Sequence, residues 1–235
     1  MVAGWRGEGG QHQGARPYQE DSWALRSLPD GGLLAVVADG MGGHAGGAVA
    51  SKIVVSVFLK MFEGGSSLRD ALLAANAAVK TGTESKPELA GMGSTLLAVR
   101  LKGDDVSWVS VGDSPFYILM AGRIERLNAD HSLAPQIDAL VARGEITAED
   151  AAAHPGRHTL REAVMGEPLN LIDEGYRRLG RDATLLLCSD GVESIPHERL
   201  AASARLSVAG VINSVISARR PHQDNVTIIK LERKG

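Results

Sequence analysis

Short apolar runs separated by turn-forming residues divide the 235-residue chain into many small elements. Seven runs of aliphatic or β-branched residues, each bounded by Gly, Asp or Pro, predict strands. They cover 21–26, 33–38, 94–101, 106–111, 116–120, 183–188 and 226–231. Runs such as LLAVVA and ATLLLC are apolar throughout, which is typical of strands covered on both faces. The pattern therefore predicts a sheet that packs on a second sheet inside and on helices outside.

Apolar residues at three- and four-residue spacing predict helices at 47–62 and 67–79, and a second pair at 196–202 and 208–218. The segment from about 128 to 170 differs, because it has few candidate strands and only two short helical patterns, at 133–143 and 147–153. We expect a single domain over 1–235 in which about 132–170 form a flap that faces the substrate.

Composition narrows the classes of function. The chain is 44% hydrophobic and 23% charged, which suits a buried core, and its net charge of -3 without a long basic run argues against nucleic acid as a partner. The single cysteine, Cys188, cannot form an internal disulfide, so we expect a reducing compartment and a cytoplasmic location. No apolar run approaches the roughly 20 residues that cross a bilayer, so we expect no membrane association.

Acidic residues stand at the ends of several predicted strands, and this repetition is the main chemical signal. They are Asp39 after LLAVVA, Asp113 in WVSVGDS, Asp190 in LLLCSDG, Asp224 before NVTII, and Glu20 with Asp21 in ARPYQED. For any one of them, an ordinary turn or strand end explains the residue. If a sandwich brings them together, however, they repel one another unless divalent cations are bound, and oxygen ligands favour magnesium or manganese. Two such ions would activate a water for attack on phosphorus, which indicates phosphoester hydrolysis.

The glycine-rich turn after Asp39 allows another interpretation. Gly40, Gly42 and Ala45 satisfy a loose dinucleotide-binding fingerprint, so a nicotinamide- or flavin-dependent oxidoreductase is an alternative. Asp39 would place a negative charge beside the pyrophosphate, and about 20 residues later only Glu63, at a predicted helix end, is acidic. Both features count against an oxidoreductase.

Taken in order, RPYQED, VADGMGGHAGG, GST, VGDS, DHS, SDG and QDN resemble the metal-dependent serine/threonine protein phosphatases of type 2C (the PPM family) in their compact bacterial form. The resemblance covers almost the whole chain. It implies an α+β fold, a four-layer α-β-β-α sandwich of two antiparallel sheets flanked by helix pairs. It also implies hydrolysis of phosphoserine and phosphothreonine in proteins through a water or hydroxide that bridges two metal ions, Mn²⁺ or Mg²⁺, with a third ion as an option.

The resemblance also implies roles for individual residues. Asp39 would be the catalytic carboxylate that bridges both metals, and Gly40 would supply a carbonyl. The other implied metal ligands are Asp190 and Asp224 for the first ion, Glu20 with Asp21 as a neighbouring or water-mediated ligand for the second, and Asp113 with Asp190 for the third. Arg16 would grip the substrate phosphate as a catalytic and substrate-binding residue, for which its planar two-pronged donor is suited.

Two positions depart clearly from the family's pattern, and Gln19 in place of the commoner Asn is a milder change. Met41 stands where many eukaryotic members have a histidine thought to protonate the leaving group, and His44 is a weak substitute. Pro115 stands where the family frequently has an arginine after GDS. A regulatory or binding module of the same fold without useful catalysis therefore stays an alternative. As partners, the family implies phosphoproteins and a cognate serine/threonine kinase.

Four basic residues gather in the predicted flap, namely His154, Arg157, His158 and Arg161. They form either a solvated face or a contact for a phosphopeptide, and the sequence leaves both interpretations open. His131 and Ser132 indicate a structural entry to the flap, because no nucleophile elbow accompanies them.

Overall fold

The computed structural model describes residues 4–42, 46–180 and 182–233. Two five-stranded sheets are formed, and every strand pair within them is antiparallel. The first sheet has the order β1 (Trp5–His12), β12 (Val226–Arg233), β11 (Thr184–Cys188), β8 (Phe116–Met120) and β9 (Arg123–Arg126). The second has the order β10 (Asp173–Arg178), β7 (Asp105–Val111), β6 (Leu96–Lys102), β3 (Leu33–Ala38) and β2 (Ser22–Ser27).

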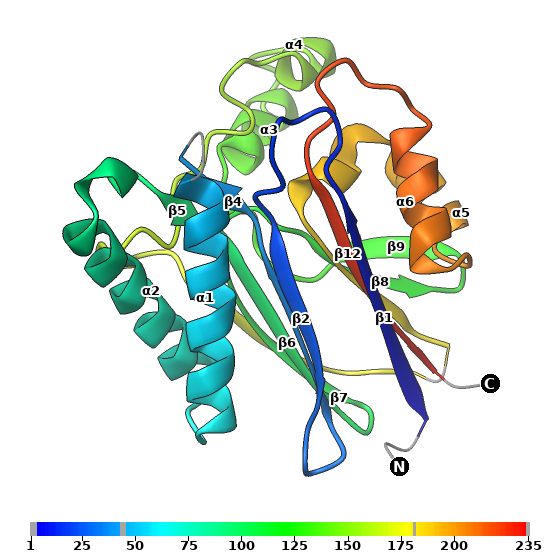
Figure 1. The fold of residues 1–235 in the computed structure, drawn as a ribbon. Helices are drawn as coiled ribbons and strands as arrows, with labels where there is room; N and C mark the ends of the chain where they lie inside the picture. Colours follow the sequence, from blue (N-terminus) through cyan, green and yellow to red (C-terminus); the bar gives the residue numbers. More distant parts are fainter. Residues whose placement is uncertain (1–3, 43–45, 181, 234–235) are drawn as a thin grey trace.

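Helix pairs cover the outer faces of both sheets (Figure 1). α1 (Gly46–Glu63) and α2 (Leu68–Ser85) lie on the second sheet, and α5 (His197–Ser203) and α6 (Val208–Ile216) lie on the first. β4 (Gly40–Met41) and β5 (Gly93–Ser94) form a small ribbon of their own, and short 3-10 helices occupy Pro87–Leu89 (η1) and Asp190–Ser194 (η2). The four-layer sandwich of two antiparallel sheets between helix pairs is confirmed.

The burial of β3 shows why apolar residues fill both faces of a central strand. Leu34, Val36 and Ala38 join the core beneath α1 and α2, whereas the alternate residues Leu33 and Val37 join the core between the sheets. All six residues of the strand are buried. Because successive side chains point to opposite faces, a strand inside a four-layer sandwich needs apolar residues at every position.

The sequence patterns missed β1, β9 and β10, and two of these strands contain glycines where a tryptophan packs. A Cβ atom on Gly9 of β1 would lie 2.4 Å from the ring of Trp23, and one on Gly175 of β10 would lie 1.9 Å from Trp108. Glycine in a strand weakens the strand signal, yet here it admits a large neighbouring ring. β1 and β10 therefore form because of contacts with neighbouring strands, and their own sequences show no regular alternation of apolar and polar residues.

The remaining predicted helices and strands differ from the structure only in where they begin, end or break. The strand expected at 94–101 is interrupted at Thr95, which donates its N–H to the carbonyl of Asp39, so the prediction of one continuous strand is wrong. The helix expected at 67–79 continues to Ser85 in α2, and the last helix ends at Ile216 rather than 218.

The segment predicted as a flap contains α3 (Ala134–Ala142) and α4 (Ala148–Ala152), at one end of the sandwich (Figure 1). A capping box between Thr147 and Asp150 begins α4. His131 and Ser132 are buried at the start of this segment, in agreement with a structural role. None of the helices in the described ranges combines the length and apolar character that a membrane crossing requires.

Candidate metal centre and active site

The acidic residues singled out from the sequence lie at the end of the sandwich that carries the flap. Asp39 directly follows β3, and Asp113 comes two residues after the end of β7. Asp190 begins η2, just after β11. Asp224 precedes β12, and Glu20 and Asp21 precede β2. Because β2 runs antiparallel to β3 and β12 runs antiparallel to β11, the starts of β2 and β12 lie beside the ends of their partners.

Asp21 joins the two sheets. Its Oδ2 accepts hydrogen bonds from Thr227 Oγ1 at 2.7 Å and from Ser189 Oγ at 2.8 Å, both donors being on the other sheet or at its edge. The side chain is 4% exposed, and burial raises the pKa of its carboxyl group to about 6 although both hydroxyls lower it. These hydrogen bonds give Asp21 a structural function between the sheets, which the sequence did not indicate.

Asp39 and Asp190 are at the centre of the acidic group. Each keeps part of its surface exposed, yet protein atoms enclose it closely enough that burial raises the pKa of each carboxyl group well above 3.8. Asp21 and Asp190 raise the pKa of Asp39 further, and Asp113 and Asp224 raise that of Asp190. Asp190 Oδ1 and Asp21 Oδ1 are buried, and no donor among the described residues forms a hydrogen bond with them. This is a concentration of negative charge that needs positive charge close by.

Asp113 lies at the edge of this group, next to the base of the flap. It is 8% exposed, and burial raises the pKa of its carboxyl group to about 7, with Asp130 raising it further and Arg126 lowering it. Arg126 Nη2 donates to the carbonyl of Asp113 at 2.6 Å, and Arg126 Nη1 donates to Asp130 Oδ2 at 3.1 Å. Sequence reasoning missed Arg126, because β9, which carries it, gave no strand pattern. The family frequently has an arginine where this chain has Pro115, close to Asp113. In this structure Arg126, from strand β9, lies beside Asp113 instead.

Arg16 pairs with Asp224. Arg16 Nη2 lies 2.5 Å from Asp224 Oδ2, and this hydrogen bond raises the pKa of the guanidinium. The other oxygen, Asp224 Oδ1, accepts from the backbone N–H of Asn225 at 2.8 Å. Arg16 is thus held beside the acidic group, and Asp190 and Glu20 also favour its charge.

Asn225, which sequence reasoning left without a role, anchors the loop that carries Arg16 and Glu20. Its Nδ2 donates to the carbonyls of Gln13 and Tyr18, and its Oδ1 accepts from the N–H of Glu20. The side chain is 3% exposed, so these bonds form inside the protein. In the sequence, only its place in the QDN motif indicated that Asn225 belongs to the site.

The glycine-rich turn brings helix α1 close to Glu20. A Cβ atom on Gly40 would lie 2.2 Å from the carbonyl oxygen of Gly47, and one on Gly47 would lie 2.8 Å from the carbonyl carbon of Gly40. Glycine is therefore required at both positions by close backbone approach. His44 and Ala45 lie outside the described residues. Because all the strand pairs of both sheets are antiparallel, the parallel sheet of a dinucleotide-binding fold is not formed and the oxidoreductase interpretation is wrong.

The described side chains do not form a ready metal site: as placed, no group of three or more His, Cys, Asp or Glu residues within the described ranges could hold a metal ion. Asp224, for example, is paired with Arg16. The chemistry of these side chains nevertheless fits a hard divalent cation, which prefers carboxylate oxygens as ligands. The carboxyl group of Asp190 is close enough to raise the pKa of Asp39, and Asp190 Oδ1 has no hydrogen bond within the described residues. Cys188 is fully buried, and burial raises the pKa of its thiol, which excludes it as a nucleophile.

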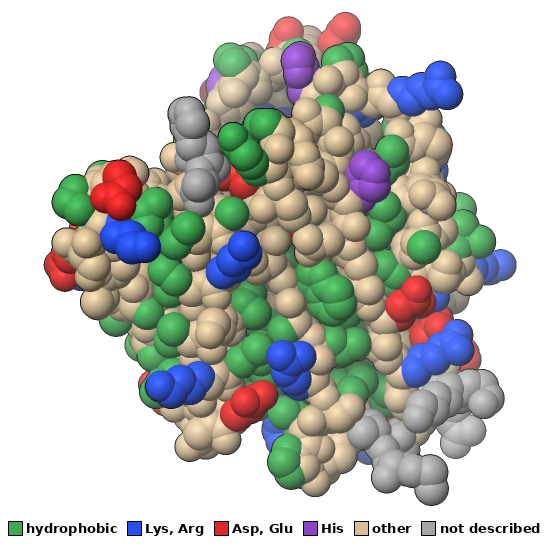
Figure 2. Space-filling model, in the orientation of Figure 1, with side chains coloured by type: hydrophobic (Ala, Val, Ile, Leu, Met, Phe, Trp, Pro, Cys, Tyr) green, Lys and Arg blue, Asp and Glu red, His purple; other side chains and the backbone are tan. Residues whose placement is uncertain are grey.

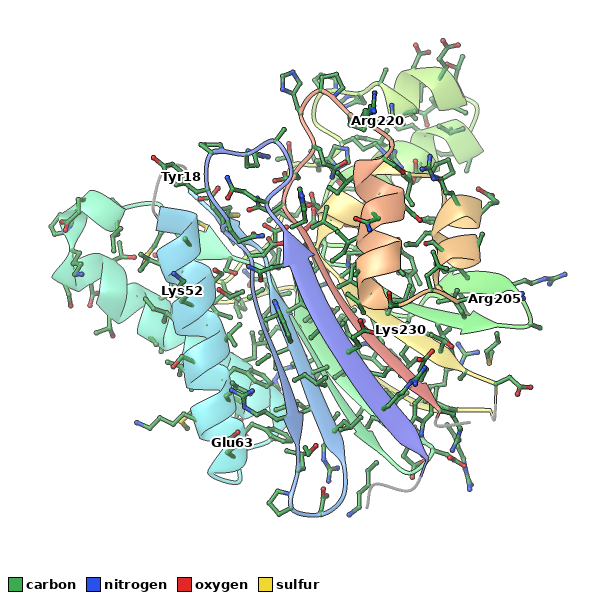
Figure 3. All side chains as sticks on the ribbon, turned by 45° about the vertical axis from the view of Figure 1, so that its right-hand side comes forward. Tyr18, Lys52, Glu63, Arg205, Arg220 and Lys230 are labelled. Atoms are coloured by element: carbon green, nitrogen blue, oxygen red, sulfur yellow. The ribbon has the colours of Figure 1, made fainter. Side chains whose placement is uncertain are left out.

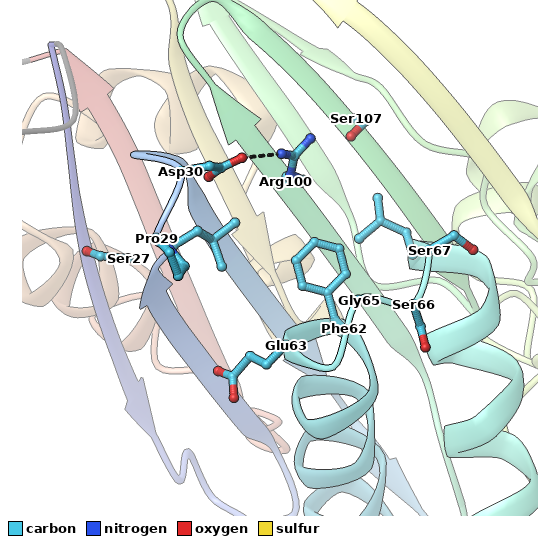
Figure 4. A pocket seen from close by; sticks show the side chains of 12 residues that line it. Ser27, Pro29, Asp30, Phe62, Glu63, Gly65, Ser66, Ser67, Arg100 and Ser107 are labelled. Carbon is cyan, nitrogen blue, oxygen red and sulfur yellow. Dashed lines mark hydrogen bonds and ion pairs between the residues drawn. The ribbon is translucent and has the colours of Figure 1, made fainter.

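Two cavities flank the acidic group. One of about 330 Å³ is lined by residues that include Arg16, Asp190 and Asp224, and one of about 910 Å³ extends from Asp113 beneath the flap helices. A third, of about 780 Å³, lies between the end of α1 and the β2–β3 turn, with the Asp30–Arg100 ion pair at its edge (Figure 4). It contains none of the predicted site residues. On the face seen in Figure 2, basic and acidic side chains are interspersed rather than gathered by sign.

Comparison with known proteins gives consistent matches. The family model described as protein phosphatase 2C matches residues 7–224. The serine/threonine phosphatase stp of Listeria monocytogenes (strain EGD-e) is 32% identical over 233 residues, which cover 93% of this chain and 91% of that protein. The serine/threonine protein phosphatase PstP of Mycobacterium tuberculosis is 34% identical over 217 residues, covering 86% of this chain but only 41% of the relative.

Solved structures are similar over nearly the whole chain. The M. tuberculosis phosphatase PstP/Ppp has a TM-score of 0.84 at 30% identity, covering 99% of this chain and 100% of that one. The catalytic domain of PstP in complex with two manganese ions has a TM-score of 0.80 at 29% identity, covering 99% of each chain. The phosphatase Stp1 of Staphylococcus aureus has a TM-score of 0.85 at 27% identity, covering 100% and 98%.

Proposed function

The chain belongs to the protein phosphatase 2C family, and from that premise we propose that it removes phosphate from phosphoserine and phosphothreonine in proteins with Mn²⁺ or Mg²⁺. The observation that carries the proposal is the convergence of carboxyl groups from both sheets at one end of the sandwich, beside Arg16. The similar PstP catalytic domain, solved in complex with two manganese ions, supports a requirement for metal.

The proposed metal ligands are those implied by the sequence. Asp39 would contact both ions and Gly40 would contribute its carbonyl. The remaining proposed ligands are Asp190 and Asp224 for the first ion, Glu20 with Asp21 nearby for the second, and Asp113 with Asp190 for an optional third. When bound, the ions would polarise the phosphate ester and activate the bridging water that attacks phosphorus.

The protein's own groups would orient the substrate. Asp224 holds the guanidinium of Arg16 by one oxygen, so Arg16 can present its remaining N–H groups to the phosphate. Asp224 accepts from Arg16 and Asn225, and because a carboxylate has about four lone-pair sites, it would still be able to hold an ion. Met41 carries no titratable proton, so the proton for the leaving oxygen must come from another group.

The proposed partners are phosphoproteins and a serine/threonine kinase that phosphorylates them. The proposed location is the cytosol, on the sequence argument from the single cysteine. A regulatory module without catalysis stays the alternative, and calorimetric titration with manganese separates the two when paired with an activity assay. Such a module would bind metal and phosphopeptide without turnover.

The test is hydrolysis of para-nitrophenyl phosphate and of a phosphothreonine peptide, with added manganese and with chelator. We expect Asp39→Ala and Asp190→Ala to abolish turnover while the circular dichroism spectrum stays native, because these side chains carry repelling charge rather than core packing. Asp182→Ala, which removes an exposed acid from the chain segment just before β11, is the matched control. Activity that survives complete metal removal would contradict the proposal.

A further inference from the structure

Arg220 lies on the loop between α6 and β12, at the flap end of the molecule (Figure 3). It lines both cavities beside the acidic group, the one of about 330 Å³ that contains Arg16 and the one of about 910 Å³ beneath the flap. Glu193 and His158 also line both cavities, so the two cavities lie side by side at these three residues. A chain bound with its phosphate at Arg16 would therefore pass Arg220.

The loop that carries Arg220 is fixed to the segment that carries Asp190. Arg220 Nε donates to the carbonyl of Ser194 at 3.1 Å, and the buried Gln223 Nε2 donates to the carbonyl of Gly191 at 3.0 Å. The preceding residue, Arg219, has a φ of 50°, a left-handed conformation that costs free energy in a residue other than glycine. The main chain thus holds Arg220 at this place despite local strain.

With Arg16 assigned to the phosphate, Arg220 is the arginine of the smaller cavity that is left for a second anionic group. Arg16 is paired with Asp224 at 2.5 Å. Glu193 accepts a hydrogen bond from Tyr117 at 3.0 Å and lies 3.6 Å from Arg126. Within the described part of the chain Arg220 forms no ion pair, and its hydrogen bond to Ser194 uses only Nε. Nη1 and Nη2 remain for an anionic partner.

Two of the four basic residues of the flap, Arg157 and His154, are engaged within the flap. Arg157 donates to both carboxylate oxygens of Asp138, at 2.6 and 3.0 Å, so its charge is balanced within the flap. His154 accepts from the N–H of Gly156 and completes a turn. His158 is exposed and lines both cavities.

We propose that Arg220 is a specificity-determining residue that binds a second anionic group of the substrate, one or two residues from the phosphorylated side chain. The group is a carboxylate of Asp or Glu or a second phosphate, since a guanidinium binds both in the same way. A sphere with the volume of the smaller cavity is about 9 Å across. Because an extended chain advances roughly 3.3–3.6 Å per residue, two groups bound in this cavity can be only one or two residues apart. This inference rests on the proposed function.

The test compares phosphothreonine peptides that differ only beside the phosphothreonine. One set carries Asp one or two residues before or after it, a second carries Asn at the same positions, and a third carries phosphoserine there. The measured quantity is the ratio of kcat/KM between an anionic peptide and its Asn counterpart on the same protein, which cancels changes in the catalytic step. Binding of the same labelled peptides is measured by fluorescence anisotropy, so the preference is also tested without turnover.

For the unchanged protein we expect a preference of about 3- to 10-fold for at least one anionic position, falling in high salt. Arg220→Gln should reduce this ratio to about 1, and Arg220→Lys should keep part of it. Arg205→Gln, which removes an exposed arginine farther from the flap, should leave the ratio unchanged (Figure 3). The Asp and phosphoserine peptides show which source of negative charge is preferred.

Two outcomes would overturn the inference: no preference in the unchanged protein for either anionic set, or an equal ratio in Arg220→Gln and the unchanged protein. If no peptide is hydrolysed but anisotropy shows a preference that depends on Arg220, the proposed function fails and the inference holds for binding. If all peptides are hydrolysed equally, the proposed function stands and the inference fails.

Discussion

Replacing Asp113 by Asn should change how the stability of the chelator-treated protein depends on pH. Asp113 is 8% exposed at the base of the flap, and its pKa is raised to about 7 from 3.8, chiefly by burial and next by the charge of Asp130. Asn has nearly the shape of a protonated Asp but releases no proton. The substitution thus removes the titration and preserves most of the packing.

The sign follows from proton binding in the two states. Above pH 3.8 the unfolded chain has released the Asp113 proton, whereas the folded chain keeps it up to about pH 7. Stability therefore falls as pH rises through this window, at about 1.4 kcal/mol per pH unit, and is flat above it. Between pH 5 and 8 the Asp113 contribution falls by up to about 3 kcal/mol. His131 acts oppositely, because burial lowers its pKa and its protonation at low pH costs stability, but it is the same in both proteins.

The assay is urea unfolding at pH 5 and pH 8 in chelator, with Asp182→Asn as the control at an exposed position. The measured quantity is the free energy of unfolding of Asp113→Asn minus that of the unchanged protein. We expect this difference to be higher at pH 8 than at pH 5 by up to about 3 kcal/mol, so that the variant is relatively more stable at pH 8. Any constant cost of the amide cancels between the two pH values. Equal pH dependence in the two proteins would refute the account of Asp113 as a buried acid held protonated.

Three further substitutions test other parts of the site. Gly40→Ala should lower the thermal midpoint by several degrees, because its Cβ would lie 2.2 Å from the carbonyl oxygen of Gly47; an unchanged midpoint in differential scanning calorimetry would contradict this close approach. Thr227→Val should cost about 1–3 kcal/mol of unfolding free energy by removing the 2.7 Å hydrogen bond to Asp21, whereas Thr227→Ser should keep most of it, and equal urea midpoints would argue against the bond. Arg126→Ala should reduce kcat/KM for a phosphopeptide about tenfold with partial rescue by Arg126→Lys, and full activity in the alanine variant would remove Arg126 from the site.

The sequence carried enough information to predict the central strands and the candidate acids. The apolar run 33–38 became β3 without a change of boundary, because a strand buried on both faces leaves a local signature. The acids at strand ends could be named for the same reason, since Asp39 directly follows that run. The strands β1 and β10 could not be predicted, because Gly9 and Gly175 admit the rings of Trp23 and Trp108, contacts that only the folded chain brings about.

Residue types and their order thus determined which strands are buried and which oxygens are available for a cation. Only the tertiary structure decided how these groups are balanced: that Thr227 and Ser189 hold Asp21 across the two sheets, that Arg16 pairs with Asp224, and that Arg126 reaches Asp113. The reason is physical. Burial and charge–charge interactions act over a few ångströms through space, between residues that here lie up to 208 positions apart in the chain.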